Sequence, residues 1–430
     1  HARAMALLHA GIVVYIGSKA KELFDAGIVV YIALIVLGVW RLVCYWRCTG
    51  KWFQYCNYCF ILMLTVLVVL SYEIYMFFIA TISADGKSAW HLLPSWVQPL
   101  SVAGPSCAAF TFLLVSKDVF MHVREIRDDN SVQRHDRAVQ IVMLPAVYGT
   151  MAMSSLARCY TALCKPGTDK AREEQALIRS ETMFMVGDLY EAWALYQFGI
   201  LTMELLESAI SKQVLSPKDD ERAAARALMV AHAAVERLAW VGILCFVLVA
   251  FVQAGYAVFL LTLGGADYTN FDDALSQFTA AGFLASGAAL YQLMIVEGTF
   301  HHYLESYAPF LKFLTVKIMV TFAFFQKGAF QVVAFLKGLM PDLVQDLADK
   351  IPILGTLVNF EKIQFEVFYA SLILVESVLV ALLISWAWSA QEAWYDEYID
   401  LDQRQLERDS EAILAGESPS RKNYGTYYGA

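Results

Sequence analysis

The stretch KFLTVKIMVTFAFFQ, residues Lys312–Gln326, is an apolar run that carries a charged side chain, Lys317, several residues inside its start. Apolar runs of this kind are typical of membrane-spanning helices. A lysine near bilayer depth costs on the order of 3 kcal/mol on insertion scales, so it normally faces other helices, a carboxylate partner or water. The stretch therefore predicts a polar site inside a membrane protein.

The composition of the whole chain also indicates a membrane protein. Hydrophobic residues make up 58% of the 430 residues and charged residues 17%, against roughly 45–50% and about 25% in soluble domains. A mean hydropathy of +0.50 over this length predicts an all-α, polytopic membrane protein. The formal net charge is −9. Because no basic stripe gathers on one segment, we expect no nucleic acid as a partner.

Nine apolar segments predict about nine transmembrane helices. They lie at residues 26–46, 55–82, 99–121, 138–162, 188–207, 238–262, 275–300, 309–336 and 364–390. A shorter, charged segment at 5–24 is expected to lie at the membrane interface. Lys and Arg outside the spans are modestly enriched on the side that holds the C-terminal tail. We therefore predict a cytoplasmic tail, with the loop from Gly264 to Asp273 on the opposite face.

A second polar set lies in DLYEAWALYQFGILTMELLE, residues 188–207. Asp188 and Glu191 are three residues apart and therefore share a helical face. Two acids one turn apart in an apolar helix are costly unless they share a cation or protons. We predict that Lys317 lies within salt-bridge or one-water reach of Asp188 or Glu191. Such a pair either fixes the helix register or lines a site for an anionic or amphipathic substrate.

Other polar and sulfur-containing side chains have simpler interpretations. Glu73 in the second predicted span is interpreted as an interfacial carboxylate near the helix end, with a buried functional acid as the alternative. The clustered cysteines are expected to be ordinary buried thiols, with palmitoylation or a zinc site as the alternatives. These are Cys44, Cys48, Cys56 and Cys59.

The sequence gives little support for metal or enzyme chemistry. Glu297, His301 and Glu305 are spaced like metal ligands, but they stand at a helix end, where solvated Glu and His are ordinary. Nucleotide-binding loops, zinc-protease motifs and the serine nucleophile elbow are absent from the sequence. We therefore predict no metal, no cofactor and no enzymatic activity.

Four stretches, together with the run Lys312–Gln326, resemble the sequence of a known family. They are Tyr307-Ala308-Pro309 with Phe330–Val333, Gln133-Arg134 with MLPAVYGTMAMSS at 143–155, Tyr190-Glu191-Ala192-Trp193 with Tyr196-Gln197-Phe198 and Glu204, and ALYQLMIV at 289–296. In these stretches the chain resembles the organic solute transporter alpha subunit and transmembrane protein 184 family. The resemblance covers about residues 99–390. The chain departs from it at Ser208-Ala209, where relatives carry a glycine pair.

The resemblance implies a carrier for organic anions or steroid-like amphipathic solutes in a eukaryotic plasma membrane or endomembrane. The residues expected to bind substrate are Asp188, Glu191, Tyr196, Gln197, Lys317 and Gln326. We expect residues 1–98 to hold the interfacial helix and two additional transmembrane helices, 99–390 the seven-helix family core, and 391–430 an acidic cytoplasmic tail.

Membrane lipids are the expected partners. A single-span partner subunit, a larger membrane complex and a homo-oligomer are left open. The alternative function is a non-transporting receptor, adaptor or structural accessory subunit of a larger membrane assembly. It is motivated by the two additional N-terminal spans and the long acidic tail.

Overall fold

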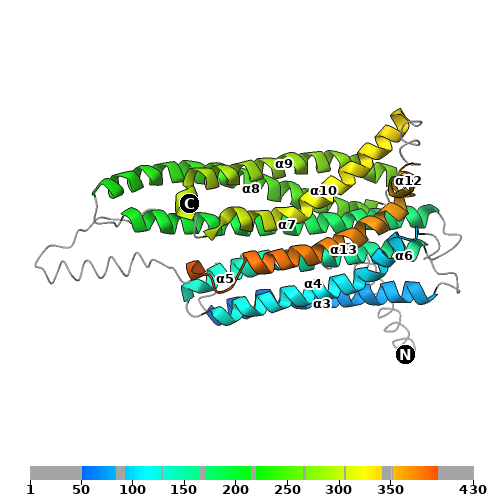
Figure 1. Ribbon diagram of the computed structural model, residues 1–430, viewed down its shortest axis with the longest axis horizontal. Helices are drawn as coiled ribbons and strands as arrows, with labels where there is room; N and C mark the ends of the chain where they lie inside the picture. Colours follow the sequence, from blue (N-terminus) through cyan, green and yellow to red (C-terminus); the bar gives the residue numbers. More distant parts are fainter. Residues whose placement is uncertain are drawn as a thin grey trace, which may run out of the picture.

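The computed structural model describes residues 51–83, 93–126, 129–163, 170–214, 219–264, 268–304, 307–340, 350 and 352–395. Within these residues the protein is helical and contains no strand. The helices lie side by side along one axis as an elongated bundle (Figure 1). The interfacial segment predicted at 5–24, the span predicted at 26–46 and residues 396–430 of the tail lie outside the described residues.

The elements follow one another along the chain, with α6 continuing from α5 and η2 continuing from α8. They are α3 (Lys51–Ser83), α4 (Val97–Glu125), α5 (Asp129–Val142), α6 (Leu144–Leu163), α7 (Lys170–Val214), α8 (Asp219–Phe259), the π-helical turn η2 (Leu260–Gly264), α9 (Tyr268–Leu304), α10 (Pro309–Leu339), α12 (Pro352–Val358), α13 (Lys362–Ala387) and the 3-10 turn η4 (Ala393–Tyr395).

Six of the described helical stretches are long and apolar enough to cross a membrane. They are Ile61–Thr81, Val97–Glu125, Val132–Leu163, Glu236–Thr262, Ala280–Leu304 and Lys362–Ala387. The predicted number of nine is therefore not confirmed. Helices α7 and α10 are not among the six, although they run alongside the others (Figure 1). Both carry charged side chains along their length, and these charges form the candidate site.

Helix α6 forms the centre of the bundle. Every side chain of α6 from Leu144 to Tyr160 is buried, because α3, α4, α7 and α13 pack around it. Pro145 lies where α5 ends and α6 begins, as expected for a residue that cannot donate the helical hydrogen bond. The break between α5 and α6 therefore coincides with this proline.

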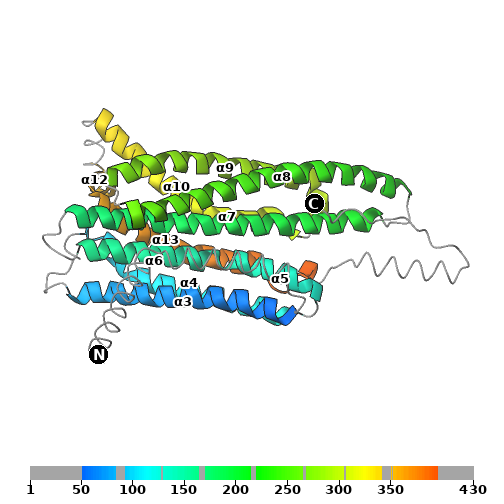
Figure 2. The same cartoon turned by 180° about the vertical axis from the view of Figure 1, so that it is seen from behind.

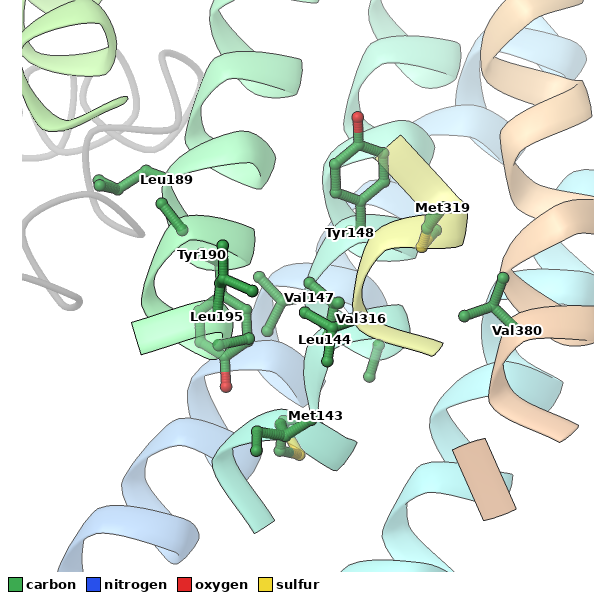
Figure 3. Close-up of a cluster of buried hydrophobic side chains, with 14 of the residues drawn as sticks. Met143, Leu144, Val147, Tyr148, Leu189, Tyr190, Leu195, Val316, Met319 and Val380 are labelled. Carbon is green, nitrogen blue, oxygen red and sulfur yellow. The ribbon is translucent and has the colours of Figure 1, made fainter. Parts of the chain in front are cut away.

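Helix α7 joins two halves of the bundle. It packs against α6 on one side and against α8 and α9 on the other, and Figure 2 shows the same arrangement from behind. Helix α10 packs against α7 and α13 and then diverges from the bundle toward Leu339 (Figure 1). Apolar side chains fill the space where these helices meet (Figure 3). They include Val147 and Tyr148 of α6, Leu189 and Tyr190 of α7, Val316 and Met319 of α10, and Val380 of α13.

A buried ion pair attaches α3 to this core. Arg158 of α6 contacts Glu73 of α3, with 2.9 Å between Nη2 and Oε1, and Ser154 donates a hydrogen bond of 2.9 Å to the same oxygen. The interpretation of Glu73 as an interfacial carboxylate is wrong, because only 1% of it is exposed. The physical reason is Arg158, a cation on the central helix that needs a carboxylate partner in apolar surroundings.

The first residues after α13 pack against the start of α10 and against α5. Lys312 Nζ lies 2.7 Å from Glu392 Oε2 and 4.9–5.7 Å from the ring centroids of Tyr307, Trp388 and Trp394. On the other side, the ring of Tyr395 stacks on His135 of α5 at 4.1 Å. Residues 391–395 of the predicted tail are thus part of the packed structure.

Candidate functional site

The predicted contact between Lys317 and an acid of α7 is present. Lys317 Nζ lies 2.8 Å from Glu191 Oε1 and donates a second hydrogen bond of 2.7 Å to Ser286 Oγ of α9. The ring centroid of Phe246 of α8 lies 4.4 Å from the same nitrogen. Four helices, α7, α8, α9 and α10, therefore meet around one ammonium group.

A strained turn at the start of α10 helps to fix the position of Lys317. Ala308 has a left-handed backbone, with φ 47° and ψ 56°, which costs roughly 1–2 kcal/mol for a residue with a Cβ. Pro309 begins the helix, where a missing N–H does no harm. Lys312 Nζ donates 2.9 Å to the carbonyl of Tyr307 and closes the turn. This arrangement sets the rotation of α10, and with it the face that carries Lys317.

The Lys317–Glu191 pair lies in apolar surroundings. Glu191 is 0% exposed and Lys317 6%, and Leu189, Tyr190 and Val316 are buried beside them. Among the described residues, Glu191 Oε2 accepts no hydrogen bond. Two charges are costly to remove from water, and the pair repays that cost only when its remaining polar atoms are satisfied. The bare oxygen leaves this pair incompletely satisfied.

Asp188 does not pair with Lys317. Its Oδ1 accepts a hydrogen bond of 3.1 Å from the hydroxyl of Tyr148 on α6. Gly187 permits this contact, since a Cβ there would lie 2.8 Å from the Tyr148 ring. The two acids on one face of α7 thus have different partners. Glu191 faces Lys317 on α10, and Asp188 faces the central helix.

The other predicted site residues have contacts of their own and do not join the pair. The ring of Tyr196 lies 5.5 Å from both Trp193 and Trp240. Gln197 is buried, and its Oε1 accepts no hydrogen bond within the described part of the chain. Gln326 donates to Glu376 of α13, so it belongs to the contact between α10 and α13.

The structure also contains a second ion pair between α7 and α10 that sequence reasoning did not identify. Lys327 Nζ lies 2.7 Å from Glu181 Oε2, and both side chains are partly exposed. A neighbouring acid of α13, Glu366, accepts 2.7 Å from Ser180, which is also hydrogen-bonded to Ser155 of α6. The available signal was the equal spacing of ten residues between the two lysines and between the two glutamates.

Four cations inside the bundle have carboxylate partners. Arg158, Lys312, Lys317 and Lys327 each form an ion pair among the described residues. Three further acids of α7 and α13, Asp188, Glu366 and Glu376, accept a hydrogen bond from a hydroxyl or an amide. Among the described residues, these carboxylates outnumber the lysines and arginines that pair with them. A solute anion can bind a lysine here only by competing with a carboxylate.

Metal ligation finds no support in the described residues, which contain no group of three or more His, Cys, Asp or Glu side chains arranged around a common point. Glu305 and the cysteines at 44 and 48 lie outside the described residues, as do the side chains of Cys56 and Cys59.

A comparison with known protein families matches residues 100–393 to one family, described as organic solute transporter Ostalpha. The chain belongs to the Ostalpha family. It is therefore an integral, multi-pass membrane protein of a transporter family, which is consistent with the prediction that it is not an enzyme. The matched range contains both ion pairs between α7 and α10, whereas α3 precedes it. Comparisons with curated proteins and with solved structures find no match.

Proposed function

We propose that this Ostalpha-family protein carries organic anions or steroid-like amphipathic solutes across the membrane, and that the acidic group of the solute binds Lys317. The observation that carries the proposal is the buried Lys317–Glu191 pair, at 2.8 Å, where α7, α8, α9 and α10 meet. An ionisable group inside a membrane bundle usually marks a substrate or ion pathway. The family supports a role in membrane solute transport.

The surroundings of Lys317 suit an amphipathic solute. Its ammonium has three N–H donors, of which Glu191 and Ser286 accept one each. A sulfate or carboxylate can replace Glu191 as an acceptor. The ring of Phe246 on α8, whose centroid lies 4.4 Å from the ammonium, offers an apolar aromatic surface for a steroid body.

Uptake of a steroid sulfate by vesicles that contain the purified full chain tests the proposal. Lys317→Met keeps side-chain length and apolar contact but removes the charge, so we expect at least a tenfold loss of uptake per amount of folded protein in the vesicles. Lys337→Met is the matched control, because Lys337 lies on the same helix and is exposed. Normal uptake by well-expressed Lys317→Met protein would overturn the proposed site.

The alternative of a receptor, adaptor or accessory subunit rests on the N-terminal spans outside the family match. Helix α3, one of these spans, is bound to α6 of its own chain by the buried Glu73–Arg158 pair. This contact weighs against α3 as a helix held ready for another chain. The division of the chain at residues 98 and 390, a single-span partner and a homo-oligomer stay predictions.

A further inference from the structure

The site proposed to bind an anion is electrically neutral as it stands. Lys317 Nζ is held by Glu191 Oε1 at 2.8 Å and by Ser286 Oγ at 2.7 Å. An anion that reaches Lys317 while Glu191 is ionised meets a like charge in a region of low dielectric constant, where repulsion is strong. Simple addition of an anion would leave one uncompensated negative charge in the bundle. The carboxylate must therefore lose its charge for an anion to bind.

The second oxygen of Glu191 is suited to that change. Glu191 is fully buried, and its Oε2 accepts no hydrogen bond from the described residues. A bare carboxylate oxygen in apolar surroundings favours the protonated form, in which the group carries one O–H donor. Protonation at Oε2 also leaves Oε1 as a much weaker partner for the ammonium, so Lys317 can turn to another acceptor.

We propose that Glu191 takes up one proton when a solute anion binds Lys317, so that the anion and a proton occupy the site together. The inference rests on the proposed function. The proton comes from the aqueous phase and forms an O–H bond at Glu191 Oε2. The Lys317–Glu191 contact is exchanged for a Lys317–anion contact, and no other bond changes. The site is neutral before and after: ammonium with carboxylate first, ammonium with solute anion afterwards.

The charged groups around Glu191 leave one rival proton acceptor. The titratable side chains that act on it are Lys317 of α10, Asp188 of α7 and Tyr148 of α6. Helices α8 and α9 contribute Phe246 and Ser286, which do not titrate. The acids of α13 have other partners, since Glu366 interacts with Lys327 and Glu181 and Glu376 with Gln326. Asp188 is the rival, because it is half-buried and only three residues away.

The number of protons taken up per bound anion tests the inference directly. Pregnenolone sulfate is a suitable probe, because its sulfate stays ionised throughout the working pH range. Calorimetric titration of the purified full chain in buffers of different ionisation enthalpy gives the proton number of the wild-type protein without any substitution. We expect about one proton per bound sulfate, and an apparent Kd that rises up to tenfold per pH unit where Glu191 is ionised before binding.

Two variants identify the acceptor. Glu191→Gln resembles the protonated acid, so it should bind the sulfate with no proton uptake and with a Kd independent of pH. Glu207→Gln, an exposed acid of the same helix, should behave as wild type. Proton uptake that persists in Glu191→Gln and disappears in Asp188→Asn would overturn the assignment to Glu191.

The failures of the two proposals are distinguishable. Sulfate binding by the wild-type protein without proton uptake overturns this inference and leaves the proposed function intact. No binding by wild type or by Glu191→Gln at any pH overturns both. Binding by Glu191→Gln at a pH where wild type does not bind supports the inference.

Discussion

Lys327 of α10 donates a hydrogen bond of 2.7 Å to Glu181 of α7, ten residues along each helix from the pair of Lys317 and Glu191. The two helices run in opposite directions. A single alignment of α10 along α7 therefore requires the two lysines to be as far apart on α10 as the two glutamates are on α7. Ten helical residues span about 15 Å. Sliding α10 along α7 by one turn would break both ion pairs together. The two pairs together therefore fix the axial position of α10 along α7.

The first prediction concerns the more buried of the two ion pairs, Lys317 with Glu191. Lys317→Met leaves Glu191 as an unpaired buried carboxylate, which should lower the free energy of unfolding by about 3–5 kcal/mol. The pair Lys317→Met with Glu191→Gln removes both charges and should recover most of that loss. Thermal unfolding of the protein in detergent measures the change. A double variant as unstable as the sum of the two singles would show that the charges do not interact.

The second prediction compares the two pairs. Lys327 and Glu181 have side chains 25% and 20% exposed, against 8% and 0% for Lys317 and Glu191. Water reaches the Lys327–Glu181 pair more easily. Lys327→Met should therefore lower the free energy of unfolding by roughly 1–3 kcal/mol, between the values for surface and buried pairs. The charge swap Lys327→Glu with Glu181→Lys should restore stability. A loss equal to that of Lys317→Met would contradict this ranking.

The sequence predicted the Lys317 contact because a lysine in an apolar run has few alternatives to a carboxylate. It could not choose between Asp188 and Glu191. That choice depends on Tyr148, which lies 40 residues earlier on the central helix and donates its hydroxyl hydrogen bond to Asp188. Glu73 was misjudged for the same reason. Its partner Arg158 lies 85 residues later, and sequence position alone does not show that α3 packs on α6.

The spans were predicted most reliably where apolar composition decides. The predicted segment 99–121 falls within α4, and 364–390 largely coincides with α13. Helix α7 differs, since it runs from Lys170 to Val214 and far exceeds the predicted 188–207. Periodicity identifies the apolar part of a helix, whereas the polar continuation depends on neighbours outside it. Gln326 was placed in the site by resemblance, and its contact with Glu376 follows only from the packing of α10 on α13.

The third prediction tests whether α3 is an integral part of the protein. Glu73→Leu leaves Arg158 buried without its carboxylate and should lower the free energy of unfolding by about 3–5 kcal/mol. Glu73→Leu combined with Arg158→Met replaces the ion pair by apolar contact and should recover much of it. Thermal unfolding gives both values. An unchanged melting temperature in Glu73→Leu would mean that α3 contributes little to the core.

The fourth prediction concerns the segment that follows α13. Glu392 holds Lys312 at 2.7 Å and accepts 2.5 Å from the indole of Trp394, so Glu392→Ala should release residues 389–395 from the bundle. A cysteine placed at Ser389 should then react faster with a water-soluble maleimide than in the otherwise unchanged chain. The same cysteine in a Glu361→Ala background is the control, because Glu361 caps the other end of α13. Equal rates in all three proteins would contradict the predicted role of Glu392.

The fifth prediction is the membrane orientation. Gly264, at the end of η2, lies at the opposite end of the bundle from Trp388, at the end of α13 (Figures 1 and 2). The connections at these two ends should therefore face opposite sides of the membrane. The modest excess of Lys and Arg on the tail side predicts that the tail is cytoplasmic. A glycosylation tag inserted at residue 266 should be modified in cells, whereas a tag after residue 395 should not. Modification of both tags would contradict the arrangement of the helices, because the two connections would then lie on the same side of the membrane. Modification of the tail tag alone would contradict the predicted orientation, because the side richer in Lys and Arg would then not be cytoplasmic.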